Sequence, residues 1–184
     1  MKYASKFSIL RLGTWVLILG LFSGCASMSE SQCQQADWRA RGLADGRAGH
    51  SATRINDHVD ACSKAGITPD HRSWTQGWED GIRSYCTANN GWQEGSRNQI
   101  YMGGCRGQTG EDAFLNHYRL GQQLYGLLQQ VQRNDVESKR LEQVLRDAKT
   151  DEDRSRVREQ LRRIDYDQLR LRALITGMHL MAPR

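Results

Sequence analysis

Three short segments of the sequence repeat the pattern glycine, apolar residue, any residue, acid, glycine. The copies occupy residues 42–46, 77–81 and 91–95. Tryptophans stand inside the second and third copies and about one helical turn before the second. Carboxylates beside aromatic rings suit a sugar or a cationic group. These side chains and one nearby histidine form a candidate ligand groove, which comprises Asp45, His58, Trp74, Trp78, Asp80, Trp92 and Glu94.

The same repeat has a structural interpretation. Two glycines four residues apart lie on one face of a helix. Each costs about 1 kcal/mol of helix propensity relative to alanine, so close approach of another backbone or ring has to compensate. The acids would then pair with nearby arginines such as Arg39, Arg47, Arg54 and Arg83. The sequence favours this packing role over a ligand site.

His58 is the best single candidate for a catalytic base, with Asp45 as the acid that orients it. No specific motif supports catalysis, however. The chain has no Gly-x-Ser-x-Gly elbow, no His-Glu-x-x-His pair and no phosphate-binding loop. A histidine that simply hydrogen bonds within its helix, for example to Asp57, is the favoured alternative. We assign no catalytic residues and expect a non-catalytic protein.

Four cysteines, Cys33, Cys62, Cys86 and Cys105, form an even set, as in disulfide-bonded exported proteins. Three connectivities are possible. We favour Cys33 with Cys62 and Cys86 with Cys105, because sequential pairing closes two separate loops. Zinc is the alternative, since His58 and Cys62 are four residues apart on an expected helix. No Cys-x-x-Cys pair supports it, and we predict neither a metal nor another cofactor.

The first residues have the pattern of a bacterial lipoprotein signal. Residues 2–11 carry three cations, residues 12–22 are apolar, and the small residues Ser23 and Gly24 precede Cys25. This is the order of a secretory signal, and its apolar core is too short to span a bilayer. We therefore predict that residues 1–24 are removed and that Cys25 is the lipid attachment site.

The residue after Cys25 bears on location. Ala26, in place of aspartate, favours retention in the outer membrane, facing the periplasm, although ordinary cleavage after Ala26 is an alternative to lipidation. The formal net charge of +5 includes the cations of the signal, so the remaining chain is nearly neutral. A nucleic-acid partner is not expected, because no one-sided basic cluster is present.

An ordered set of cysteines, aromatic residues and glycines resembles bacterial lipoproteins that carry domain of unknown function 2799. The resemblance extends to about residue 126 and implies a small exported lipoprotein domain with a helical tail. It implies no catalytic residues. The residues that carry it are Cys33, Asp37, Trp38, Gly42, Asp45, Gly46, Gly49, Arg54, His58, Cys62, Gly66, Pro69, Asp70, Gly77, Gly81, Tyr85, Cys86, Asn90, Gly91, Gly95, Tyr101, Cys105, Phe114, Tyr118 and Gly121.

Composition changes near residue 110. Residues 25–110, here called the head, are rich in cysteine, glycine and tryptophan, whereas residues 111–184, here called the arm, contain no cysteine and no tryptophan. No run alternates apolar and polar residues long enough to indicate a sheet. We therefore predict an all-α fold, in which a small disulfide-stapled helical head precedes a long helical hairpin or coiled-coil-like arm.

The arm contains two apolar series whose members are mostly three or four residues apart, as in helices that pack along one stripe. Thr150 and the acids that follow it suit a helix start between the two series. An antiparallel hairpin is the simplest structure, and one continuous rod of roughly 100 Å is the alternative. The series are Leu120, Leu124, Leu127, Val131, Leu141, Leu145 and Ala148, then Val157, Leu161, Ile164, Gln168, Leu171, Ile175 and Met178.

These observations lead to an expected function. We expect a protein that is anchored to the envelope membrane by its N-terminal lipid and has an interaction or scaffolding role. Its partner would be an envelope protein or a second copy, bound through residues 111–178. The alternative is a binding module for cell-wall glycan or peptide that uses the groove. A hydrolase comes third.

Overall fold

The structure is a computed structural model that describes residues 27–183. The predicted signal at residues 1–24 and the predicted attachment site Cys25 lie outside the described residues. Within the described range the chain is helical and contains no strand, which confirms the all-α prediction. Its seven helices are α1 (Glu30–Gln34), α2 (Trp38–Arg47), α3 (Arg54–Ser63), α4 (His71–Tyr85), α5 (Ala88–Ser96), α6 (Glu111–Asp147) and α7 (Asp151–Leu180).

Side-chain caps start most of these helices. The side chains of Ser29, Asp37, Asp70, Thr87 and Thr150 accept hydrogen bonds from backbone N–H groups in the first turns of α1, α2, α4, α5 and α7. Such caps satisfy donors that have no partner within the helix. The helix starts are therefore set locally, whereas the pairing of the helices depends on the glycines.

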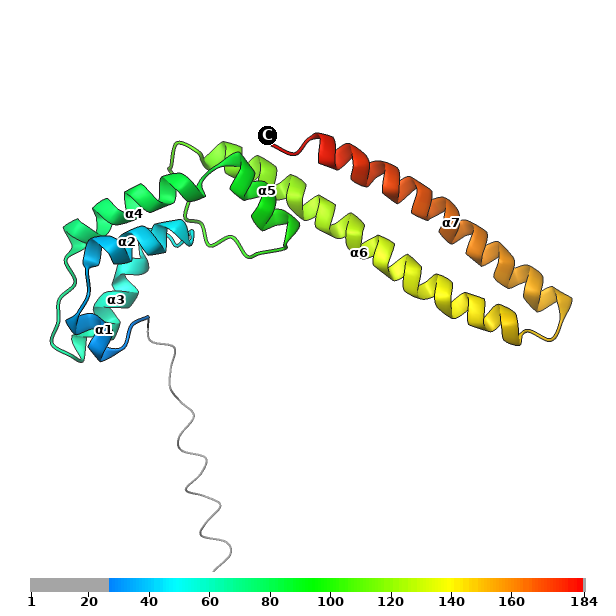
Figure 1. The fold of residues 1–184 in the computed structure, drawn as a ribbon, viewed down its shortest axis with the longest axis horizontal. Helices are drawn as coiled ribbons and strands as arrows, with labels where there is room; N and C mark the ends of the chain where they lie inside the picture. Colours follow the sequence, from blue (N-terminus) through cyan, green and yellow to red (C-terminus); the bar gives the residue numbers. More distant parts are fainter. Residues whose placement is uncertain (1–26, 184) are drawn as a thin grey trace, which may run out of the picture.

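Helices α2 and α4 lie side by side and run parallel (Figure 1). Gly42 and Gly46 of α2 face the backbone of α4, and Gly77 and Gly81 of α4 face the backbone of α2. A Cβ atom placed on Gly77 would lie 2.9 Å from the backbone nitrogen of Leu43, closer than real Cβ atoms come to another backbone. The two helices touch because these positions lack side chains.

Helices α5 and α6 repeat this arrangement. Gly91 and Gly95 of α5 face the backbone at Phe114 and Tyr118, and Gly121 of α6 faces the backbone of α5. The order of the contacts shows that these two helices also run parallel (Figure 1). The packing interpretation of the glycine repeat is thus confirmed at all three copies.

The main core is formed mainly by α4, with Ile55 of α3, the Cys86–Cys105 disulfide and the start of α6. It is built around Trp74, Trp78, Ile82, Tyr85 and Phe114, all of them buried. Large side chains from α4 fill the space beside the glycine contacts. The aromatic content of the head is therefore used mainly for its interior.

The structure joins the cysteines sequentially, as expected. Cys33–Cys62 links α1 to α3, and Cys86–Cys105 links the end of α4 to the loop that precedes α6. Met28 packs into a small second core beside the first disulfide. The first bond holds the five-residue helix α1, and the second fixes the loop before α6 to the end of α4.

Helices α6 and α7 form an antiparallel hairpin that projects from the head (Figure 1). Leu124 and Leu141 of α6 and Val157, Leu171 and Met178 of α7 are buried in this structure. The chain turns between Asp147 and Asp151, which confirms the hairpin over the continuous rod. Among residues 27–183, no helix is both long enough and apolar enough to cross a membrane.

Candidate functional site

Asp45 and His58 meet in the interior of the head. His58 Nε2 lies 2.8 Å from Asp45 Oδ2, and Trp74 Nε1 donates a hydrogen bond to the same oxygen at 2.9 Å. His58 and Trp74 are each only 1% exposed, and Asp45 is 6% exposed. The pair that the sequence offered as base and orienting acid therefore exists, but it is enclosed by α2, α3 and α4.

The surroundings of Asp45 keep its carboxylate ionised. Burial raises the pKa of Asp45, but the hydrogen bonds from His58 and Trp74, with the nearby charges of His58 and His50, outweigh it and hold the pKa below its ordinary value. A buried anion is stable only when such donors replace its water shell. Burial and the nearby Arg54 cation lower the pKa of His50, despite the Asp45 carboxylate.

Ser27 completes the cluster. Its Oγ lies 2.8 Å from His58 Nδ1 and donates to the backbone carbonyl of Asp57 at 2.8 Å. The Ser27 hydroxyl, the His58 imidazole and the Asp45 carboxylate thus form a chain of contacts that leads from the N-terminal segment into the core. No sequence pattern indicated this contact, because Ser27 stands 31 residues before His58 and belongs to no motif.

The order serine, histidine, acid is that of nucleophile, base and orienting group in several hydrolases, but here Ser27 gives its one hydroxyl hydrogen to the Asp57 carbonyl and not to His58. In this structure the imidazole is closed to solvent, and Ser27 is the one member of the three that is partly exposed. Any chemistry would therefore have to occur at Ser27 Oγ. The same hydrogen bonds also attach the N-terminal segment to the core. This structural role explains the contacts without a substrate.

The predicted ligand groove is not formed, and the tryptophans explain why. The rings of Trp74 and Trp78 stack on each other with centroids 6.2 Å apart, and both side chains are buried. Trp78 Nε1 donates to the His50 carbonyl at 2.8 Å. These rings cannot act as open platforms for a sugar. Both rings lie on the same face of α4 as Gly77 and Gly81, and this face packs against α2.

The remaining groove residues lie elsewhere. Asp80 is exposed and forms ion pairs with Arg39 of α2 and Arg83 of its own helix. Glu94 lies beside Tyr85, where burial raises the tyrosine pKa and the Glu94 charge adds to that effect. Trp92 is part-buried, with its ring 6.3 Å from that of His179 in α7. Only Asp45, His58 and Trp74 are joined by hydrogen bonds.

The zinc alternative fails on chemistry. It required Cys62 as a free thiolate beside His58, but the Cys62 sulfur is bonded to Cys33. Over residues 27–183, no group of three or more histidine, cysteine, aspartate or glutamate side chains is placed to hold a metal ion.

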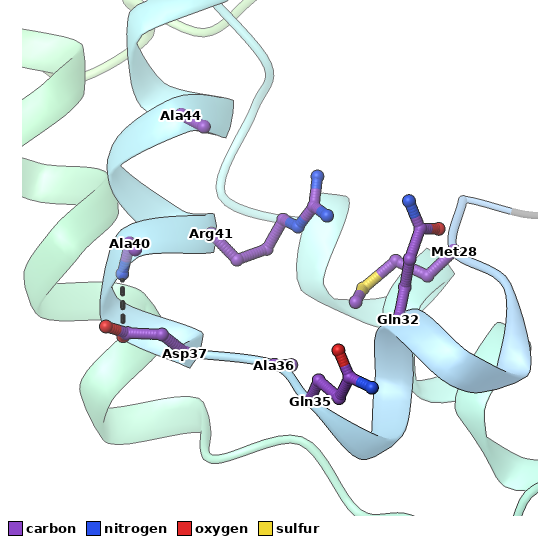
Figure 2. A pocket seen from close by; sticks show the side chains of 8 residues that line it. All are labelled: Met28, Gln32, Gln35, Ala36, Asp37, Ala40, Arg41 and Ala44. Atoms are coloured by element: carbon purple, nitrogen blue, oxygen red, sulfur yellow. Dashed lines mark hydrogen bonds between the residues drawn. The ribbon is translucent and has the colours of Figure 1, made fainter.

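A surface pocket of about 480 Å³ opens between α1 and α2 (Figure 2). The Arg41 side chain reaches from α2 across this pocket toward Met28 and Gln32 (Figure 2). Within residues 27–183, no carboxylate lies at salt-bridge distance from its guanidinium. The pocket is lined by Met28, Gln32, Gln35, Ala36, Asp37, Ala40, Arg41 and Ala44.

The hairpin carries a polar layer midway along its seam. Gln168 Nε2 of α7 donates to Asp135 Oδ1 at 2.6 Å and to the Val131 carbonyl at 3.3 Å. Asn134 Nδ2 donates to Asp167 Oδ2 at 2.8 Å. Gln168, the polar member of the second series, thus lies where the two helices hydrogen bond, and these bonds fix their register.

The outer face of α7, opposite the seam, carries a second apolar stripe. It consists of Tyr166, Leu169, Ala173 and Leu180, which are three, four and seven residues apart. Tyr166 is 74% exposed and Leu169 is 68% exposed. A helix that is already packed on one side does not need such residues on the other. We call these four residues the outer stripe.

Comparisons with known proteins give one result for this chain. A search of curated proteins and a search of solved structures each found no match. Residues 37–123, which include α2 to α5 and the first part of α6, match the family described as "Protein of unknown function (DUF2799)". The chain therefore carries a DUF2799 domain over these residues.

Proposed function

We propose that this protein is a lipid-anchored protein of the bacterial envelope that binds a partner protein through its helical arm. The outer stripe of α7 is the observation that carries the proposal. The N-terminal pattern that ends at Cys25 supports the anchor, with an outer-membrane location facing the periplasm. The two disulfides are in keeping with an oxidising compartment.

The shape of the arm suits a binding role. Helix α7 has 30 residues, so it is about 45 Å long, and the hairpin extends away from the head (Figure 1). The seam already provides the contact between the two helices. The outer stripe is therefore free to receive an apolar helix face from another protein, with side chains inserted at the same three- and four-residue spacing.

Charge favours a different protein over a second copy. Arg170 and Arg172 flank the middle of the outer stripe and are exposed. A symmetric pair of α7 helices centred there would bring these like charges together, which disfavours self-association. Arg170 already lies 3.8 Å from the Asp167 carboxylate of its own helix, so a partner helix with an acidic flank would form its ion pair with Arg172. The proposed partner is an envelope protein that presents such a helix.

The arm proposal can be tested by crosslinking in cells. A photoreactive residue at position 169 should capture one envelope protein, which mass spectrometry identifies, whereas the same residue at exposed position 156 should not. Leu169→Asp, combined with a photoreactive residue at position 173, should abolish the capture. Equal capture from positions 169 and 156, or capture of this chain alone, would contradict the proposal.

The anchor is tested separately. The intact mass of the mature protein should correspond to a chain that begins at Cys25 and carries acyl chains. A mass that fits cleavage after Ala26 would disprove the anchor but leave the arm proposal intact.

A hydrolase is the second candidate, and the Ser27–His58–Asp45 order is the observation that favours it. A fluorophosphonate probe labels serines that are activated in this way. If Ser27 has a structural role alone, the protein should remain unlabelled. Labelling that disappears in Ser27→Ala and persists in Ser29→Ala would favour the hydrolase.

A further inference from the structure

The N-terminal segment of the described chain is fixed to the head without a free linker. Ser27 hydrogen bonds to His58 and to the Asp57 carbonyl, and Met28 is only 3% exposed. A few residues later, Cys33 is bonded to Cys62. The predicted attachment site Cys25 precedes Met28 by three residues, which span roughly 11 Å at most. A lipid on Cys25 would therefore bring the membrane surface close to Met28.

The pocket between α1 and α2 includes Met28 in its wall. We propose that this pocket binds the phosphate headgroup of an anionic phospholipid in the membrane to which the protein is anchored. The inference rests on the proposed anchoring at Cys25, since the anchor sets which surface of the head meets the lipid.

Arg41 is the residue expected to hold the phosphate. Its guanidinium lies over the pocket and has no carboxylate partner within the described residues (Figure 2). A guanidinium matches two phosphate oxygens through paired hydrogen bonds. The amide groups of Gln32 and Gln35 line the rim of the same pocket and can donate to the remaining oxygens.

The rest of the lining fits the apolar part of a lipid. Ala36, which precedes α2, and Ala40 and Ala44 of α2 offer an apolar surface for the glycerol and the first methylene groups. The volume of about 480 Å³ lies within the range of small-ligand sites. Asp37 is the acid in the lining, and its Oδ1 is engaged by the Ala40 N–H at the start of α2. That helix terminus favours its negative charge.

The proposal can be tested on the mature protein, purified with its own N-terminus in a neutral detergent. Binding of dihexanoyl phosphatidylglycerol is measured by calorimetry and compared with dihexanoyl phosphatidylcholine, glycerol 3-phosphate and inorganic phosphate. We expect the phosphatidylglycerol to bind most tightly. Arg41→Ala should weaken it about fivefold, the usual effect of one arginine near an anionic lipid surface.

Arg47→Ala is the matched control, because Arg47 is exposed on the same helix and does not line the pocket. It should leave the affinity unchanged, whereas Ala40→Trp should block the pocket and abolish binding. Equal losses in Arg41→Ala and Arg47→Ala would overturn the proposal. Glycerol 3-phosphate binding as tightly as the lipid would also overturn it, in favour of a soluble phosphate ligand.

The intact mass of the same preparation separates the two proposals. If the acyl chains are present and phosphatidylglycerol does not bind, the anchor stands and the pocket proposal fails. If the acyl chains are absent and binding depends on Arg41, the anchor fails and the pocket proposal stands as a headgroup site.

Discussion

Two helix pairs of this protein are held together in opposite ways. Helices α2 and α4 run parallel and touch backbone to backbone at four glycines. Helices α6 and α7 run antiparallel, and side chains such as Leu141 and Val157 are buried between them. The first pair has no room for a single added carbon atom, whereas the second can exchange one side chain for another of similar size. The head is thus built for a fixed geometry and the arm for adjustable contacts.

The supporting interactions differ in the same sense. The head has two disulfides and a buried carboxylate with two donors. The arm contains no cysteine, and its ion pairs, such as Arg140 with Glu137, are exposed and lie within one helix. Pairs of that kind contribute little to stability. The arm therefore depends on its seam, and the head depends on bonds that can be cut selectively.

Reducing both disulfides should have the largest effect, because it should unfold the head and leave the arm helical. Loops of 29 and 19 residues each contribute about 3 kcal/mol, so their combined loss approaches the whole stability of a small domain. Tryptophan near-ultraviolet circular dichroism, which reports on Trp74 and Trp78, should disappear. Much of the far-ultraviolet helix signal should remain, because it comes from α6 and α7. Survival of the near-ultraviolet signal under reduction would show that the head does not need the bonds.

Gly77→Ala should be the next largest change. The added Cβ would fall against the backbone of α2 at Arg39 and Leu43, and a backbone cannot move aside without separating the helices. We expect a loss of about 3 kcal/mol, at the upper end for overpacking. Urea unfolding followed by tryptophan fluorescence measures it.

Gly126→Ala is the control for this substitution. Gly126 also lies inside a helix, but a Cβ there would meet nothing within 4 Å. Alanine should therefore stabilise the protein by about 0.5–1 kcal/mol through helix propensity. Equal and small effects at both positions would show that the α2–α4 contact is looser than the structure indicates.

Much of this head could be predicted from the sequence, and the reason is that covalent and steric constraints are local. The cysteine order allowed the correct pairing, and glycines four residues apart indicated close helix contact. The groove prediction was wrong because Trp74 and Trp78 share the helix face of the glycines. Packing of this face against the neighbouring helices buries both rings, so they cannot line an open groove.

Other features depended on the tertiary arrangement alone. Asp45, Asp80 and Glu94 occupy the same place in the repeat, yet only Asp45 receives hydrogen bonds from His58 and Trp74. Which acid becomes buried depends on where α3 docks, and no repeat records that position. The contact of Ser27 with His58 depends on the path of the N-terminal segment in the same way.

Asp45→Asn should destabilise the head by about 2 kcal/mol at neutral pH, because hydrogen bonds to a buried charge are lost. The folded state lowers the Asp45 pKa, so the carboxylate contributes its full stability above its ordinary value of 3.8. That contribution is lost as pH falls below 3.8 toward the folded value. The difference between wild type and variant should therefore shrink below that pH in urea unfolding series.

Asp80→Asn is the matched control, since its side chain is 40% exposed and its ion pairs are at the surface. It should change stability by less than about 1 kcal/mol at neutral pH. If both variants behaved alike, the Asp45 carboxylate would have no special role in the head.

Gln168→Leu should give the smallest effect and the opposite sign. Gln168 Oε1 is buried without a partner, and its amide donates to Asp135, which is exposed and can be hydrated instead. A leucine removes the unsatisfied acceptor and adds apolar burial, so the arm should gain about 1 kcal/mol. The register would then depend on the Asn134–Asp167 bond alone. Thermal unfolding should rise by a few degrees, while gel filtration should reveal additional oligomers. A lower melting temperature with a uniform monomer would instead mean that the polar layer contributes stability as well as register, and that the arm is built as strictly as the head.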